Sequence, residues 1–207
     1  MIIQSKCLVL CKIFYMPRYK AFVESDVLEK AMNVFWKNGY EATSVRLLEK
    51  EMGINQFSIY ASFKNKKNLF IQAIHNYQEH VKKTRFRTLL HENAGLAELE
   101  AFLFKVVSIN TAGIGSKGCL IVNTAGEIGN KDIEIAMEVN RYYDFIRDML
   151  RNIFRNAIAK QEIPANTNIE QQANFFLGIM QSISIASKTM NCLQLNDFIT
   201  VALAQIK

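Results

Sequence analysis

The sequence predicts an all-α fold, and three observations lead to this expectation. The chain of 207 residues contains 9 glycines and 2 prolines, so few positions force a helix to stop. Half of the residues are hydrophobic and 21% are charged, a balance that indicates a packed core and excludes disordered, collagen-like and disulfide-scaffold classes. Apolar residues also recur at three- and four-residue spacing along most of the chain.

This spacing and the capping residues predict the helices in chain order. The first runs from about residue 25 to 38 and stops at Gly39. Two short helices follow at 45–52, with N-cap chemistry from Thr43 and Ser44, and at 56–63, capped by Asn55. Later helices are expected at 69–90, 97–111, 120–127, 132–161, 169–189 and 196–206, with a glycine-rich break over 113–118.

The two short helices are joined by a tight turn at Gly53, which is the helix-turn-helix pattern. The second of them carries a polar, short-chained face suited to a DNA major groove about 12 Å wide. In that groove Gln56 can pair with adenine and Ser58 can contact a base or a phosphate. Just beyond the helix, three lysines can neutralise phosphates: Lys64, Lys66 and Lys67.

Positive charge is concentrated in the same half of the chain. Residues 1–92 contain 15 Lys and Arg against 8 Asp and Glu, whereas residues 93–207 contain 10 against 11. Such an asymmetry favours a polyanion as the partner of the first half. The alternative is a chance imbalance on a solvated surface.

A pattern of aromatic, glycine and lysine residues runs without a gap from about residue 22 to 70. It includes FWKNGYEATSV at 35–45, MGIN at 52–55, SIY at 58–60 and FKNK at 63–66. This pattern resembles the N-terminal DNA-binding region of TetR-type (TetR/AcrR) transcriptional regulators. The stretch GCLIVNTA at 118–125, with Glu127, is similar to a segment in one subset of that family. Glu49 and Phe57 depart from the family pattern, so no operator sequence is transferred.

The resemblance implies a domain organisation and a function. Residues 22–68 would form a three-helix, helix-turn-helix DNA-binding domain, and residues 69–207 a helical ligand-binding and dimerisation domain. Residues 1–21 form an N-terminal extension; flexibility is one alternative for it, and Met16 is an alternative start that leaves the status of residues 1–15 open. The expected function is a ligand-responsive repressor that binds a pseudo-palindromic double-stranded DNA operator as a homodimer and releases it on binding a small-molecule effector.

DNA contacts are also implied position by position. Tyr60 and Lys66 match positions that usually contact phosphates, and Thr43 or Ser44 would do so from the start of the second helix. The base-facing positions are Gln56, Phe57, Ser58 and Ala61. Phe57 could contact a thymine methyl group. For Tyr60 the alternative role is an aromatic residue at the edge of the core.

A ligand pocket and a dimer interface are expected in the second half. The candidate pocket residues are large side chains on several helices: Phe102, Tyr142, Tyr143, Met149, Phe175, Phe176 and Met180. Ordinary core packing is the alternative for each of them. Gly178, Ser182 and Ala186 are spaced four residues apart, so their small side chains share one narrow face of a helix. Another helix can approach this face closely. The resemblance implies dimerisation through the last two helices.

Cys119 has a sharper chemical alternative. It follows Gly118 at the start of a predicted helix, beside Lys117, and both the helix terminus and the cation favour the reactive thiolate. The sequence therefore allows a thiol-based sensor. The other reading is a small hydrophobic residue in the core.

The same sequence also bears on enzymes, membrane proteins and ligand carriers as alternative classes. The chain has three scattered histidines, no glycine-rich phosphate loop and no Gly-x-Ser-x-Gly turn, so an enzyme is not expected, nor are a cofactor or a metal site. The longest apolar stretch, 173–186, is too short for a membrane span, and the absence of an export signal favours a cytoplasmic protein. A helical ligand carrier without DNA binding stays open as an alternative.

Overall fold

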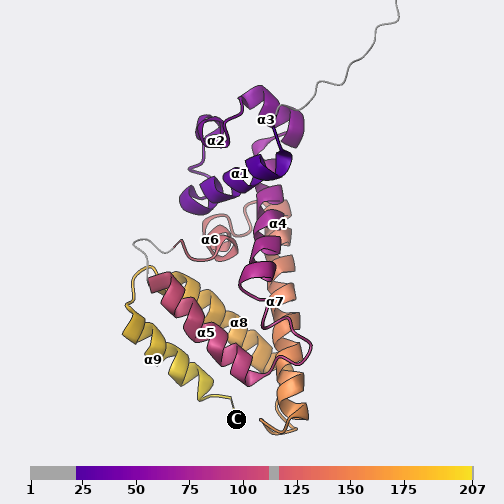
Figure 1. Ribbon diagram of the computed structural model, residues 1–207, viewed down its shortest axis with the longest axis vertical. Coiled ribbons are helices and arrows are strands. Elements are labelled where there is room, and N and C mark those ends of the chain that lie inside the picture. The colour runs from indigo at the N-terminus through magenta and orange to yellow at the C-terminus, as the bar shows by residue number, and fades with distance from the viewer. Residues whose placement is uncertain (1–21, 112–116, 207) are drawn as a thin grey trace, which may run out of the picture.

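The computed structural model describes residues 22–111 and 117–206, which form α-helices and contain no strand (Figure 1). The helices are α1 (Glu24–Asn38), α2 (Val45–Met52), α3 (Gln56–Phe63), α4 (Lys66–Thr84), α5 (Leu96–Thr111), α6 (Leu120–Glu127), α7 (Ile133–Ala159), α8 (Ile169–Ala186) and α9 (Cys192–Leu203). The all-α prediction is confirmed. The predicted N-terminal extension, with Cys7 and Cys11, and Gly113 and Gly115 of the glycine-rich break lie outside the described residues.

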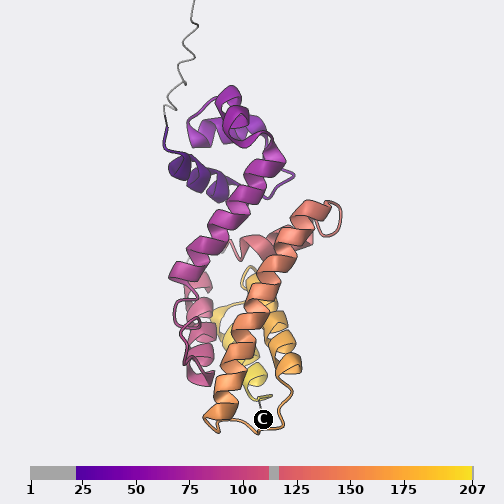
Figure 2. The same ribbon diagram turned by 90° about the vertical axis from the view of Figure 1, so that its right-hand side faces the viewer.

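The helices α1, α2 and α3 pack together at one end of an elongated molecule, and α4 leads from them to the remaining helices (Figures 1 and 2). At the other end, α5, α7, α8 and α9 form a bundle, in which α7 packs along α8. The short helix α6 lies between the two ends and contacts α1, α4, α7 and α8. None of the described helices has the length and hydropathy needed to cross a membrane.

Predicted and observed helix bounds differ most at α4 and α9. α4 begins at Lys66 because the Asn65 side chain caps it, and it ends at Thr84, six residues before the predicted end. After it, Phe86 and Leu89 turn into the core, which takes the chain off the helix axis. α9 begins four residues early because Asn191 and Gln194 form a capping box.

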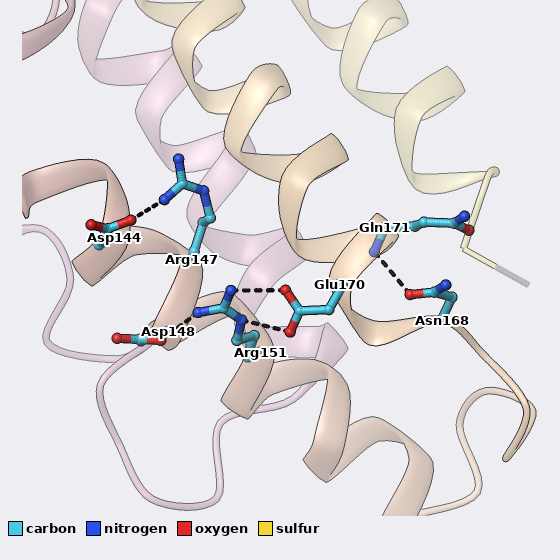
Figure 3. A network of polar contacts seen from close by, with 7 residues as sticks. All are labelled: Asp144, Arg147, Asp148, Arg151, Asn168, Glu170 and Gln171. Carbon is cyan, nitrogen blue, oxygen red and sulfur yellow. Dashed lines mark hydrogen bonds and ion pairs between the residues drawn. The ribbon is translucent and has the colours of Figure 1, made fainter. Parts of the chain in front are cut away.

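Buried apolar residues form one continuous core from α1 to α9. On the outside of the bundle, Arg151 of α7 makes two hydrogen bonds of 2.8 Å to the Glu170 carboxylate of α8 and one of 2.6 Å to Asp148 (Figure 3). Arg147 pairs in the same way with Asp144. Arg151 thus ties the first turn of α8 to α7, whereas the Arg147 pair lies within α7, and the charges of both arginines are already neutralised.

The junction between α1 and α6 depends on one carboxylate. Glu127, the last residue of α6, accepts hydrogen bonds from the backbone N–H groups of Tyr40 at 2.9 Å and Glu41 at 2.7 Å. This approach needs glycine at position 39, because φ there is +81° and a Cβ would lie 2.7 Å from a Glu127 oxygen. Nearby, the Trp36 indole N–H donates to the Gly118 carbonyl at 3.1 Å. These two contacts hold α1 and the loop after it against the two ends of α6.

We expect Gly39→Ala to lower the free energy of unfolding by at least about 1 kcal/mol more than Gly53→Ala. Both glycines have positive φ, but nothing lies within 4 Å of a Cβ at Gly53, whereas a Cβ at Gly39 meets Glu127. Because ψ is 176° at Gly39 and 23° at Gly53, the backbone costs at the two positions differ, and Gly39→Ala in a Glu127→Ala background is the control for the backbone cost alone. Urea unfolding measures the losses, and a loss from Gly39→Ala that is unchanged in the Glu127→Ala background would contradict the close approach of Glu127.

Candidate nucleic-acid interface

The outward face of α3 is the surface predicted to read DNA. Gln56, Phe57 and Ala61 are exposed, whereas Ser58 and Tyr60 are half-buried. Phe57 is 75% exposed, an unusual position for a phenylalanine that packs against nothing. The opposite face of α3 is anchored in the core by Ile59 and Phe63. The predicted base-facing residues therefore lie on a helix whose orientation is fixed by its buried side.

Two side chains hold the first turn of α3. The Asn55 side chain accepts from the Ser58 N–H at 2.8 Å, as predicted for an N-cap. The Glu49 carboxylate of α2 accepts from the Gln56 N–H. Glu49, a departure from the family pattern, therefore has a structural role, because it links α2 directly to the start of α3.

Lys64 ends α3 in a strained conformation. Its φ is 67° and its ψ is −56°, and the Asn65 N–H donates to the Phe63 carbonyl at 2.8 Å across it, which makes a γ-turn with positive φ. Such a turn costs a non-glycine residue about 1 to 3 kcal/mol. The residue in this strained conformation is a lysine, and its side chain is exposed next to the start of α4.

Lys66, in the first turn of α4, is held against the loop between α1 and α2. Its Nζ lies 4.4 Å from the centre of the Tyr40 ring and 3.5 Å from the Glu41 carbonyl oxygen. Partial burial lowers the pKa of Lys66 below its ordinary value. The ammonium and the free N–H groups at the start of α4 together suit an anion such as a phosphate.

Two expectations for phosphate contacts need correction. Thr43 is fully buried and its hydroxyl donates to the Gly39 carbonyl at 2.5 Å, so it has no surface to offer a phosphate. Ser44 is exposed and caps α2 by accepting from the Leu47 N–H. Lys67 is bound instead to the start of α7, with 2.9 Å to Glu134 and 3.5 Å to Asp132.

Sequence reasoning missed one exposed cation on this side of the molecule. Arg46 lies in the first turn of α2, two residues after Ser44, and its side chain is exposed. The sequence contains a signal for it, because a basic residue in the first turn after an N-cap lies near the helix end that the motif directs at DNA.

A cavity of about 60 Å³ lies beneath α6, lined by residues of α4, α5, α6, α7 and α8. Of the predicted pocket residues, four line it: Phe102, Tyr142, Tyr143 and Met180. The other three do not. Met149 is buried elsewhere, Phe176 packs against Phe154 with ring centroids 5.6 Å apart, and Phe175 points outward with 42% exposure.

The cavity is also lined by Arg85 and by Cys119, the residue predicted at a helix start. Cys119 is half-buried, and its N–H donates to the Ser184 hydroxyl at 2.7 Å. Burial raises the pKa of Tyr77 and of Tyr142 well above the ordinary range, and the adjacent Cys119 raises both further. The neighbouring Lys117 lies over the Trp36 ring, 5.2 Å from its centre.

Comparison with known proteins identifies this combination. Residues 27–73 match the family model for bacterial regulatory proteins of the tetR family, and residues 95–200 match the model for the tetracycline repressor-like C-terminal domain. The chain belongs to the TetR family of transcriptional regulators. It is therefore a DNA-binding regulator and not an enzyme, which also decides against a carrier that does not bind DNA.

Individual TetR-family relatives are similar over most of the chain. The HTH-type transcriptional repressor ComR of Escherichia coli (strain K12) is 26% identical over 172 residues, which cover 83% of this chain and 82% of ComR. The HTH-type regulator YezE of Bacillus subtilis (strain 168) is 29% identical and covers 91% of this chain and 98% of its own. A cysteine mutant of the regulator CifR, solved with 26-base-pair operator DNA, matches with a TM-score of 0.81, 25% identity and coverage of 92% and 100%.

We expect Lys64→Gly to raise the free energy of unfolding by about 1 kcal/mol, because glycine adopts the γ-turn without strain. The same change should weaken binding to all DNA sequences alike and reduce the salt dependence of binding by about one charge. Lys64→Ala is the matched control, since it removes the charge but keeps the strain. Thermal unfolding and fluorescence anisotropy at several salt concentrations measure both effects. A glycine variant that is no more stable than the alanine variant would contradict the strain.

Proposed function

We propose that this TetR-family protein is a ligand-responsive repressor that binds a pseudo-palindromic operator as a homodimer and releases it when a small molecule occupies the cavity beneath α6. The observation that carries the proposal is the exposed face of α3, flanked by Lys64 and Lys66. Residues 22–68 would act as the DNA-binding domain and residues 69–207 as the ligand-binding and dimerisation domain. ComR is a repressor and CifR was solved with operator DNA, which supports the same role here.

On this proposal the DNA contacts divide by chemistry. Base edges would be read by Gln56, Phe57, Ser58 and Ala61, which lie on or beside the exposed face of α3. Phosphates would be bound by Ser44, Tyr60, Lys64 and Lys66, with Arg46 added from the structure. Contacts of the second kind position the protein without reading sequence.

Gln56→Ala should change the preference among operator sequences, whereas Lys66→Ala should weaken binding to all of them. A bidentate contact to a base contributes about 1 to 3 kcal/mol of discrimination, and a lost phosphate contact reduces the salt slope by about one. Binding of randomised DNA, selected and sequenced for each variant, separates the two effects. An unchanged sequence preference in Gln56→Ala would show that α3 does not read the operator through this residue.

The proposed dimer surface lies on α8 and α9. Phe175 and Ile185 on α8 are 42% and 59% exposed, and Leu193 and Val201 on α9 are 69% and 64% exposed. Gly178, Ser182 and Ala186 of α8 lie on or beside this apolar face, and each has exposed surface. An apolar face with small residues along it suits close packing against a second copy of the same helices.

Gly178→Leu should abolish dimer formation without weakening the protomer. Outside its own helix, nothing lies within 4 Å of a Cβ at this position, and leucine favours a helix over glycine by close to 1 kcal/mol. Against a symmetric partner the same side chain overpacks twice, at about 1 to 3 kcal/mol each. Light scattering and thermal unfolding measure the two effects, with Ala159→Leu on the exposed end of α7 as the control. An intact Gly178→Leu dimer would place the interface elsewhere.

A thiol-based sensor is the second candidate for the mode of regulation, because Cys119 lines the cavity. Alkylation of this thiol would add bulk directly beneath α6. Iodoacetamide should then release operator from the wild type but not from Cys119→Ser. Mass spectrometry compares the rate at Cys119 with that at Cys192, which is exposed and serves as the internal control. Equal release from both proteins would leave Cys119 a packing residue.

A further inference from the structure

The cavity beneath α6 is mostly apolar and contains one charged side chain among the described residues. Its wall contains five aromatic rings, from Tyr77, Phe86, Phe102, Tyr142 and Tyr143. Arg85 is the one charged side chain among the described residues that line it. Such a site provides hydrophobic contact for the body of a ligand and a single cation for one end of it.

Arg85 has no carboxylate partner among the described residues. Its guanidinium lies 5.7 Å from the centre of the Trp36 ring, and the ion pairs of this region, such as Lys82 with Glu79, do not include it. The segments 1–21 and 112–116 contain no Asp or Glu. A half-buried guanidinium beside an apolar cavity is costly unless an anion pairs with it.

We propose that this cavity binds a small organic anion, a carboxylate on an apolar body, with the carboxylate paired to Arg85. The inference rests on the proposed ligand response and names the chemical class of its effector. Guanidinium groups bind carboxylates through two parallel hydrogen bonds. Burial raises the pKa of Tyr143 to about 12 and raises that of Tyr77 and Tyr142, so these hydroxyls remain protonated and can also donate to the anion.

Trp36 connects this site to the DNA-binding helices. It belongs to α1, and its ring contacts Arg85, Lys117 and Tyr77, whose ring centroid is 5.0 Å away. An anion that draws Arg85 into the cavity removes a cation from one side of the indole. Because the chain contains a single tryptophan, its fluorescence reports this event without labelling.

The test compares three probes of equal chain length, octanoate, octanamide and octylammonium, each below its micelle concentration. Titration calorimetry and Trp36 fluorescence of the full chain measure binding. We expect octanoate to bind at least about tenfold more tightly than octanamide, and octylammonium to bind most weakly, because a charge-assisted hydrogen bond is lost or replaced by repulsion. Arg85→Gln should remove the preference and Arg85→Lys should keep part of it. Lys83→Gln, which removes an exposed charge two residues before Arg85, should behave as wild type.

Equal binding of octanoate and octanamide by the wild type, or no binding of octanoate, would overturn the proposal, and neither result depends on how a variant folds. An equal loss in Arg85→Gln and Lys83→Gln would also overturn it. Operator binding is measured in parallel. Selective octanoate binding that leaves the operator bound would support the anion site and contradict the proposed ligand response, so the two failures are distinguishable.

Discussion

The contact between the Glu127 carboxylate and the backbone of residues 40 and 41 is the polar link that joins the DNA-binding helices to α6, beside the packing of α1 on α4. It satisfies two N–H groups of the loop after α1, and it does so from the last residue of α6. The lack of a side chain at Gly39 makes room for it. The Trp36 hydrogen bond to Gly118 lies at the other end of α6. The two contacts together hold α1 and the loop after it against both ends of α6.

This arrangement links the cavity to α3 through a series of direct contacts. Cys119 and Gly118, at the start of α6, form part of the cavity wall, and Glu127 at its other end binds the loop before α2. On the proposed ligand response, a displacement of α6 by a bound molecule would act on the loop before α2, and through the Glu49 hydrogen bond on the first turn of α3. The path consists of direct contacts, and each one can be removed by a single substitution.

Helix bounds that depend on neighbouring residues could be predicted from the sequence, whereas contacts between distant residues could not. The bounds of α2 and α3 were predicted correctly because Ser44, Asn55 and Gly53 act within one turn of their own positions. Glu127 binds a loop 87 positions away, and no local pattern indicates such a pairing. The predicted helix ran on to residue 90, whereas α4 ends at Thr84, so the position of Arg85 beside the cavity did not follow from the sequence.

The candidate DNA-binding site was largely predictable for the same reason. Most of its residues follow from the pattern of a short exposed helix and the lysines after it. Thr43 was the exception, because its hydroxyl turns back to Gly39, four residues earlier, and the burial that follows depends on the packing of α1 against α2. The pocket was predicted only in part, because Phe175 and Phe176 are neighbours in sequence but point in different directions from α8.

Amide hydrogen exchange at Tyr40 and Glu41 tests the junction most directly, because these N–H groups are protected by α6 through Glu127 alone. In the wild type we expect slow exchange at both positions, and in Glu127→Gln we expect exchange at least about tenfold faster, since the amide group can accept only one of the two hydrogen bonds. The amides of Ala73 and Ile74 within α4 should exchange alike in the two proteins. Fast exchange at Tyr40 and Glu41 in the wild type, or no change in Glu127→Gln, would contradict the role given to this carboxylate.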